Sequence, residues 1–439
     1  MDKIYLCIDL KSFYASCECA DRGLNSLTAR LVVADPSRGK GALCLAVSPA
    51  LKELGVKNRC RIFEIPKNVT YICAIPRMKR YMEVSAKIYS IYRKYVAEED
   101  IYVYSIDECF IDVTSYLKLY RMDVKSLAKV MIDDVFKTTG ICATAGIGTN
   151  LFLAKLALDI TAKHVDDHIG YLDDELFKRD LWFHKPITDV WNISRGTAKR
   201  LLKYGVSDLH GITMVNEDLL YKEFGINAEI LIDHANGIEP VTIKDIKNYK
   251  SKSNSLSTSQ ILFEDYDYES TLLVLKEMVD LSTLELIEKK VVISSISLYI
   301  GYSDDLRSPT GGTRRLNEFT QSRERLMEYF ITLFKETTDP NYTIRRIGLG
   351  YGNVVDEKYE TIDLFTDEEK LKKEKELQKS LIEIKKKYGK NSIIKGMDLE
   401  KNATTIKRNQ LVGGHNAGLE CPEDYENGKK VKNEYGPKS

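Results

Sequence analysis

The sequence predicts a multidomain α+β protein. Its 439 residues, of which 43% are hydrophobic and 30% charged, are enough for about three or four compact domains. Short apolar runs typical of strands, such as 4–8 and 141–147, are interleaved with helical periodicity, as in 77–96. A second set of strand and helix patterns follows residue 255. Patterns mixed in this way favour sheets covered by helices over an all-helical or all-strand fold.

The composition excludes several classes of protein. Lys plus Arg and Asp plus Glu both number 65, so the net charge is zero and any nucleic acid must be bound by locally sorted basic groups. The nine cysteines include no C-x-x-C pair, which argues against a zinc site or a disulfide framework and indicates reduced thiols in the cytoplasm. No apolar run reaches the roughly eighteen residues of a membrane helix, and residues 1–10 are too short and too acidic for a signal peptide. We therefore expect a cytoplasmic protein that does not engage a membrane.

The first apolar run, residues 4–8, is predicted to be a buried strand that ends at Asp9. Ser12 is then placed to cap a helix that begins with Phe13 and Tyr14. An acid between a core strand and a helix N-terminus is well placed to hold a metal ion that faces a phosphate. An ordinary turn acid at a strand end fits the same residues, so Asp9 alone decides nothing.

Residues 31–73 carry short strand patterns and one short helix near 49–54, which predicts a small α+β insertion. Basic residues outnumber acids there. That balance suits a surface that meets a triphosphate, although a solvated face would have the same composition. The amphipathic helix expected over 77–96 places its apolar stripe in a core.

Two adjacent acids, Asp107 and Glu108, stand between strand-type runs. Neighbouring side chains of one strand point to opposite faces, so the two carboxylates can converge on one ion only at a turn or a bulge. Solvated acids in a hairpin turn are the plain alternative.

The elements after the acid turn suggest how Asp9 and this turn come together. A helix over 124–138 ending at Gly140, a strand over 141–147 and a helix after Asn150 follow in order. This order predicts a mainly antiparallel sheet with helices on one face. On such a sheet Asp9 and the acid turn would occupy neighbouring strands.

Three motifs in this order and spacing resemble the Y-family of lesion-bypass DNA polymerases, and most of all its branch in Gram-positive bacteria and their mobile elements. They are DLKSFYAS at 9–16, SIDE at 105–108, and GIGTN at 146–150 with AKLA at 154–157 and Lys163 beyond. The resemblance extends from residue 1 to about 352 and implies a right-hand polymerase. Its parts would be a palm (1–20 and 76–180), small fingers (21–75), a helical thumb with a helix-hairpin-helix (181–246), an α/β little finger (247–355) and a C-terminal tail (356–439).

The resemblance also implies roles for single residues. Asp9, Asp107 and Glu108, with the carbonyl of Leu10, would hold two Mg²⁺ ions, which prefer hard oxygen ligands. The Tyr14 ring would act as a steric gate against a 2′-hydroxyl, although core packing is the ordinary role of such a ring. The expected triphosphate-binding residues are Ser12, Phe13, Tyr14, Lys52 and Lys163. Pro49 and Lys52 depart from the tyrosine and arginine that many relatives carry, and Lys cannot form the bidentate fork of Arg.

The second half suggests DNA contacts. Residues 191–198 resemble the hairpin of a helix-hairpin-helix, with Asn192 and Ser194 in place of the usual glycines and Gly196 following; Asn tolerates a left-handed conformation. A plain helical subdomain is the alternative. Residues 291–302 alternate between apolar and polar positions, and arginines cluster nearby. The expected contacts to the DNA backbone are Ser295, Ser297, Arg345 and Arg346.

The C-terminal segment contains a short peptide that resembles the sliding-clamp motif of bacterial polymerases. Its residues are Thr361, Ile362, Asp363, Leu364 and Phe365, with Thr361 replacing the usual glutamine. A charged helix is expected over 370–387, and a polar, Gly-rich and flexible end beyond Gly413.

Taken together, the resemblance implies a monomeric, distributive, low-fidelity DNA-directed DNA polymerase. It would use primer-template DNA and dNTPs in translesion synthesis and the SOS response, with the sliding clamp as a further partner. A catalytically silent DNA-binding or SOS-regulating relative, and a nucleotidyl cyclase, are the alternatives.

Overall fold

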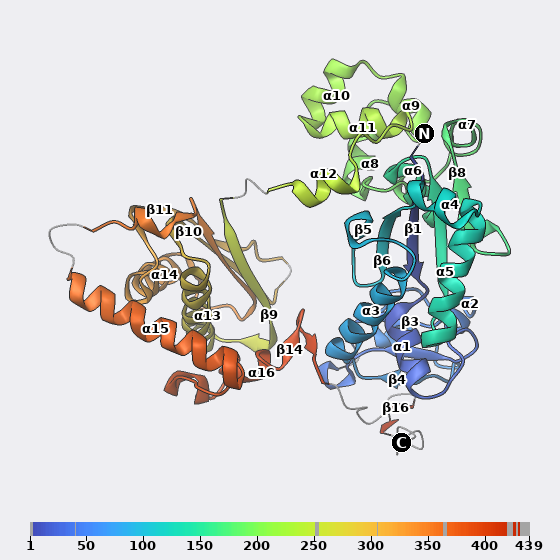
Figure 1. Ribbon diagram of the computed structural model, residues 1–439. Helices are drawn as coiled ribbons and strands as arrows, with labels where there is room; N and C mark the ends of the chain where they lie inside the picture. The colour runs from blue at the N-terminus through green and yellow to red at the C-terminus, as the bar shows by residue number, and fades with distance from the viewer. Residues whose placement is uncertain are drawn as a thin grey trace. The chain divides into compact units, whose positions relative to one another are not determined.

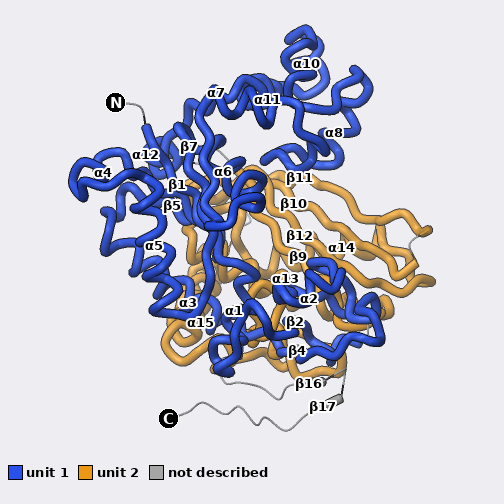
Figure 2. The backbone as a smooth tube through the Cα atoms, turned by 90° about the vertical axis from the view of Figure 1, so that its right-hand side faces the viewer, with its two compact units in different colours: residues 1–250, 418–439 blue, residues 251–417 orange. Residues whose placement is uncertain are grey.

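The computed structural model describes residues 3–39, 41–250, 254–304, 306–362, 367–418, 425–426 and 429–430. The chain forms two compact units, one of residues 1–250 with 418–439 and one of residues 251–417 (Figure 2). Both units combine sheets with helices, so the predicted α+β multidomain class is confirmed. No helix among these residues is long and apolar enough to cross a membrane.

The first unit is built around a five-stranded sheet in the order β5-β6-β1-β7-β8 (Figure 1). Its strands are β1 (Tyr5–Leu10), β5 (Ile101–Val103), β6 (Glu108–Asp112), β7 (Ala143–Gly148) and β8 (Ile169–Leu172). Strand β1 is antiparallel to both β6 and β7, and β7 is parallel to β8. The register places Asp9 opposite Glu108, so the expected meeting of the first acid with the acid turn is confirmed.

Helices cover this sheet on both faces, and the expectation of helices on one face is wrong. On one face α6 (Leu151–Asp159) packs so closely that a Cβ added to Gly146 or Gly148 would lie 2.2 or 2.1 Å from the backbone of α6. Ile147 points to the opposite face, where α5 (Val124–Thr139) contacts β7, and is 0% exposed. The continuous apolar run of β1, in place of strict alternation, is what a strand buried on both faces requires.

A smaller sheet contains the predicted insertion. Strands β2 (Leu31–Val33), β3 (Ala46–Val47) and β4 (Ile72–Ala74) pair in the order β4-β2-β3, and α2 (Pro49–Glu53) follows β3. Strands β16 (Tyr425–Glu426) and β17 (Lys429–Lys430) extend the sheet beyond β4. The polar end expected beyond Gly413 therefore includes paired strands.

Two helices link the smaller sheet to the central one. Helix α1 (Phe13–Asp21) follows β1 and contacts β2 and β3, and α3 (Met78–Tyr92) contacts both α1 and α5. Ser12 stands at the start of α1, but its side chain makes no capping hydrogen bond. Its backbone is left-handed, with φ 50°, so that its hydroxyl points elsewhere.

The remaining helices of the first unit are short. Helix α4 (Thr114–Tyr120) follows β6 and α7 (Asp174–Leu176) follows β8. A helical region then packs against α6 and β8 around a shared apolar core. Its helices are α8 (Arg195–Leu202), α9 (Leu209–Thr213), α10 (Glu217–Phe224) and α11 (Asn227–Ala235), with α12 (Ile243–Asn248) beyond them.

The second unit contains a sheet in the order β11-β10-β12-β9, with all neighbours antiparallel. Its strands are β9 (Leu256–Tyr266), β10 (Val291–Tyr302), β11 (Thr310–Thr320) and β12 (Ile344–Gly352), and the short β13 (Val355–Asp356) pairs with β10. Helices α13 (Tyr268–Glu288) and α14 (Arg323–Thr337) pack on one face (Figure 1). As predicted, Ile296 and Ile300 are buried while Tyr299 is 41% exposed.

Residues 356–417 lie in the same compact unit as residues 251–355. Helix α15 (Glu368–Tyr388) packs against α13, and Glu277 of α13, 1% exposed, accepts hydrogen bonds from the backbone N–H groups of Thr404 and Thr405 at 2.8 and 2.9 Å. The remaining elements are α16 (Thr405–Arg408), β14 (Leu411–Val412) and β15 (His415–Asn416). A buried carboxylate paired with backbone donors ties this segment to the sheet domain.

Candidate active site

The acid turn lies at one end of β1 and β6. The backbone N–H of Leu10 donates to the carbonyl oxygen of Asp107 at 3.0 Å, and the N–H groups of Tyr104 and Ser105 donate to the carbonyl of Glu108 at 3.0 and 3.1 Å. The Ser105 hydroxyl donates to Asp107 Oδ1 at 2.6 Å and accepts from the N–H of Glu108 at 3.0 Å. The serine before the two acids therefore fixes the turn that sequence reasoning required for their convergence.

The three acids perturb one another electrostatically. Burial, together with the neighbouring charges of Glu108 and Asp107, raises the pKa of Asp9 to about 7. Burial likewise raises the pKa of Glu108, although Lys155 opposes this shift. Like charges held close together favour protonation, or a bound cation that relieves the repulsion.

Lys155 contacts the acid turn, and the sequence motif assigned no role to it. Its Nζ lies 3.0 Å from both carboxylate oxygens of Glu108 and 3.0 Å from Oδ1 of Asp159, and the residue is 5% exposed. The sequence could have indicated this ion pair, because a lysine within the apolar helix α6 is buried and a buried charge requires a charged partner. Lys155 supplies the positive charge that Glu108 faces in this structure.

The three carboxylates have different contacts. Glu108 accepts a hydrogen bond from Lys155 and Asp107 accepts one from Ser105, whereas Asp9 lies at the end of β1 between β6 and β7. Within the described part of the chain, no three His, Cys, Asp or Glu side chains are arranged to hold one metal ion as they stand. The donor types nevertheless fit a hard divalent cation, since carboxylate oxygens are what Mg²⁺ prefers.

The expected gate and triphosphate residues lie around the start of α1. Burial raises the pKa of the half-buried Tyr14, and Asp107 contributes in the same direction, so the phenol lies within the field of the acid turn. Lys52 Nζ donates to Ser12 Oγ at 2.8 Å, which explains why that hydroxyl does not cap the helix. Loss of hydration lowers the pKa of Lys52, Asp9 opposes this shift, and Lys163 reinforces it.

These electrostatic interactions indicate that the predicted residues lie near one another. Phe13, buried in α1, contacts the Tyr14 ring at a centroid separation of 5.8 Å. Lys163 is exposed in the 3₁₀ turn Thr161–His164 that follows α6. Lysines from two elements thus approach the acid-bearing end of β1.

The segment 191–198 contains the left-handed residue that the sequence analysis expected. Asn192 adopts φ 68°, the left-handed conformation for which glycine is usual, and Gly196 is exposed in the first turn of α8. Ser194 caps that helix by accepting from the N–H of Thr197 at 3.2 Å. Trp191 Nε1 donates to the hydroxyl of Tyr104 at 3.1 Å, so the hairpin touches the residue that precedes the acid turn.

The face of the second sheet opposite its helices carries small polar groups. Ser295 and Ser297 of β10 stand opposite Gly352 and Gly350 of β12, where a Cβ on Gly350 would lie 2.2 Å from the Ser297 hydroxyl. Arg346 joins them, with its guanidinium 5.9 Å from the Tyr299 ring centroid. A face without bulky side chains at these positions allows the backbone of another polymer to approach closely.

The arginines of this unit separate into two groups. Arg314, Arg323 and Arg325 form ion pairs with Glu336, Asp280 and Glu318, and Arg345 lies 3.3 Å from Asp265. Arg315 stands opposite Ser295 and therefore shares its face. The sequence analysis did not include Arg315 among the expected DNA contacts, although the alternation of side chains along β11 could have indicated its face.

Two residues of the expected clamp peptide are described. The N–H of Thr361 donates to the carbonyl of Phe319 at 2.9 Å, and its hydroxyl accepts from the N–H of Phe319 at 2.8 Å. Ile362 is 55% exposed. Asp363, Leu364 and Phe365 lie outside the described residues.

Comparison with protein families identifies two matching regions. Residues 8–159 match the model of the impB/mucB/samB family, and residues 253–364 match the model of the C-terminal domain of that family. The first region contains all three acids and Lys155, and the second contains the sheet of the second unit.

Curated relatives and solved structures agree with this match. The chain is 32% identical over 420 residues to the UV-damage repair protein UvrX of Bacillus subtilis (strain 168), covering 94% of this chain and 97% of the relative. It is 29% identical to DNA polymerase IV 2 of the same organism, covering 94% and 99%. A solved Y-family DNA polymerase chimera matches with a TM-score of 0.61 at 21% identity, covering 80% of this chain and 99% of that one. The chain therefore belongs to the impB/mucB/samB family and has the Y-family DNA polymerase fold that its acid motifs predicted.

Proposed function

We propose that this protein is a DNA-directed DNA polymerase that adds dNTPs to a primer end and copies damaged templates during the DNA damage (SOS) response. The observation that carries the proposal is the placement of Asp9 opposite Glu108, with Asp107 in the adjoining turn, in a chain of this family. The relatives named above as a polymerase and a UV-damage repair protein support the same activity. Its synthesis is distributive and of low fidelity.

The acids are proposed as ligands of two Mg²⁺ ions. Burial and then the charges of Glu108 and Asp107 raise the pKa of Asp9, and a divalent cation would relieve the repulsion between these carboxylates. Asp9, the carbonyl of Leu10, Asp107 and Glu108 would hold the ions. When bound, such ions lower the pKa of the attacking 3′-hydroxyl and stabilise the charge of the leaving pyrophosphate.

The residues around α1 are proposed to bind and select the nucleotide. Lys52 and Lys163 would neutralise the triphosphate, and backbone N–H groups of Ser12, Phe13 and Tyr14 would donate to it. The Tyr14 ring would lie under the sugar and exclude a 2′-hydroxyl. Support comes from the Lys52–Ser12 hydrogen bond and from the electrostatic interactions of Lys52 with Asp9 and Lys163 and of Tyr14 with Asp107.

The rest of the chain is proposed to hold primer-template DNA. In the assignment by resemblance, 1–20 with 76–180 is the palm, 21–75 the fingers, 181–246 the thumb, and 247–355 the little finger. Asn192, Ser194 and Gly196 would contact one phosphate, and Ser295, Ser297, Arg345 and Arg346 the backbone elsewhere, giving affinity without sequence reading. The peptide 361–365 would bind the sliding clamp, and the protein would act as a cytoplasmic monomer.

Primer extension by the purified full-length chain tests the proposal. We expect extension on undamaged and lesion-bearing templates that requires Mg²⁺ and stops when EDTA removes it. A nucleotidyl cyclase would form a cyclic nucleotide without primer, and a silent DNA-binding protein would bind DNA without incorporation. Either result would refute the assignment.

A further inference from the structure

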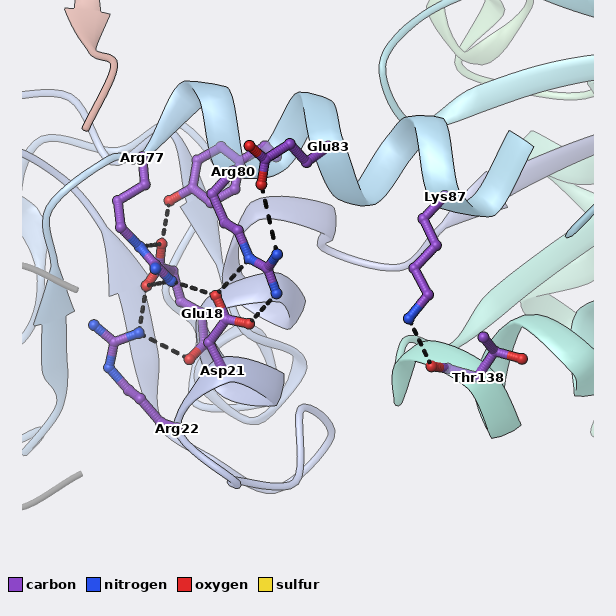
Figure 3. A network of polar contacts seen from close by, with 9 residues as sticks. Glu18, Asp21, Arg22, Arg77, Arg80, Glu83, Lys87 and Thr138 are labelled. Carbon is purple, nitrogen blue, oxygen red and sulfur yellow. Dashed lines mark hydrogen bonds and ion pairs between the residues drawn. The ribbon is translucent and has the colours of Figure 1, made fainter. Parts of the chain in front are cut away.

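A buried cluster of charged side chains joins α1 to α3, and no step of the proposed reaction uses it. Glu18 of α1 and Arg22, which follows α1, are 0% and 4% exposed, and Arg77, which precedes α3, is 3% exposed. Figure 3 shows Arg22 and Arg77 turned toward Glu18, with Asp21 and Arg80 beside them. Arg77 Nε and Nη2 donate to the two oxygens of Glu18, each at 2.9 Å.

Asp21 extends the cluster at its partly exposed edge. It accepts from Arg77 Nη2 at 2.7 Å and from Arg80 Nε and Nη2 at 2.9 and 2.7 Å. Removing several charges from water is unfavourable, and apolar side chains would join two helices as well or better. We therefore expect this cluster to fix the positions of its side chains more than to stabilise the fold.

The geometry that the cluster fixes is the position of Tyr81. This tyrosine of α3 is 0% exposed, and its hydroxyl donates to Glu18 Oε1 at 2.7 Å. Its ring stacks on the ring of Tyr14, with centroids 4.6 Å apart and planes inclined by 17°. A contact chain thus runs from the two arginines through Glu18 and Tyr81 to the proposed sugar gate.

We propose that Glu18, acting through Tyr81, is a positioning residue for sugar selection by Tyr14. The proposal rests on the proposed role of Tyr14 as the gate. A steric gate discriminates only as far as its ring resists displacement, because a ring free to retreat by a few tenths of an ångström makes room for a 2′-hydroxyl. Tyr81 is the surface behind the gate, and the anchored hydroxyl keeps that surface in place.

The test is the ratio of kcat/KM for dCTP to kcat/KM for CTP, measured by primer extension with the full-length chain. Tyr81→Phe keeps the ring and removes only the hydroxyl that Glu18 holds. We expect the ratio to fall about 3- to 10-fold, mainly through a higher kcat/KM for CTP. Glu18→Gln should lower the ratio in the same way, and Tyr14→Ala should lower it most.

A matched control removes an equivalent hydrogen bond elsewhere. The Tyr95 hydroxyl lies 3.0 Å from Asp134 Oδ2, away from Tyr14, so Tyr95→Phe should leave the ratio unchanged. A double-variant cycle separates positioning from general damage: in the Tyr14→Ala background, Tyr81→Phe should have no further effect on the ratio.

Each outcome is decisive. An unchanged ratio in Tyr81→Phe, with a lowered ratio in Tyr14→Ala, would overturn the positioning role and leave the gate intact. A Tyr14→Ala protein that still rejects CTP would refute the gate and the positioning role with it. Additive effects in the double variant would also contradict the proposal. If Glu18→Gln fails to fold, Tyr81→Phe alone decides.

Discussion

In the first unit, the sheet β5-β6-β1-β7-β8 is covered by helices on both faces and gathers carboxylates at one end of two strands. In the second unit, the sheet β11-β10-β12-β9 packs α13 and α14 on one face and spreads serines, glycines and Arg346 over the other. Both sheets are mainly antiparallel. Converging buried charges suit chemistry at one point, whereas an open polar face suits contact along a polymer.

The energetic consequences of the two sheets also differ. The acids of the first sheet repel one another in partly buried positions, which the raised pKa of Asp9 shows. The charges on the open face of the second sheet are spread out among the described residues, since Arg315 and Arg346 stand on different strands and the serines between them are neutral. Substitutions in the two sheets should therefore affect different quantities.

The largest expected effect follows from Asp107→Ala. Loss of this proposed Mg²⁺ ligand should lower kcat for primer extension at least about 10³-fold, because the ion that it would hold acts on the reacting groups. Steady-state extension assays would measure it. Asp133→Ala, which removes an exposed acid of α5, is the matched control and should retain activity.

Lys155→Met should produce the next largest effect, which is a loss of stability. The substitution leaves Glu108 without its positive partner in a poorly hydrated position, and we expect a loss of about 2 to 4 kcal/mol in the free energy of unfolding. Urea denaturation without divalent metal would measure it. The double variant Lys155→Met, Glu108→Gln should recover part of the loss; a double variant as unstable as the single one would contradict the pairing.

Asp9→Asn should stabilise the metal-free protein by about 2 kcal/mol at pH 8 while abolishing activity. The pKa of Asp9 in the folded protein, about 7, lies above its ordinary value of 3.8, so the folded state binds more protons between these pH values. The contribution of Asp9 to stability therefore falls as the pH rises from about 4 to 7 and stays low above that.

Thermal denaturation of wild type and Asp9→Asn at pH 5 and pH 8 would measure this effect. The Asn variant should lack the part of the pH dependence that comes from Asp9, and Mg²⁺ should raise Tm only in the wild type. Equal pH profiles of the two proteins would show that Asp9 titrates normally.

Arg346→Ala should have the smallest effect, which is a weaker affinity for DNA. We expect Kd for primer-template DNA to rise about 3- to 10-fold and the slope of log Kd against log salt to decrease by about 1. Fluorescence anisotropy at several salt concentrations would measure both. Arg314→Ala removes the same charge from an arginine paired with Glu336, and its smaller effect would support the assignment of faces.

Much of this organisation was predictable from the sequence. The apolar run 4–8 predicted β1, the adjacent acids predicted the turn before β6, and Gly140 predicted the end of α5. Apolar patterns and turn residues are local signals, which the sequence carries directly. The cover on both faces of the central sheet was missed, although the unbroken apolar run of β1 indicated it.

The partners of single side chains were not predictable. Lys155 meets Glu108 and Tyr81 meets Glu18 across 47 and 63 residues of sequence. Their contacts depend on which elements pack together, α6 with β6 and α3 with α1, and spacing along the chain does not encode that choice. Likewise, Ser12 was expected to cap α1 but is engaged by Lys52 from a separate element.

The most direct test of the division between the two sheets is the single-turnover rate constant for dNTP incorporation at saturating DNA, measured for Glu108→Ala and Arg346→Ala together. We predict that Glu108→Ala lowers it at least about 10³-fold while still binding DNA, and that Arg346→Ala retains at least about half of it. Incorporation by Glu108→Ala within about tenfold of wild type would contradict the assignment of chemistry to the first sheet.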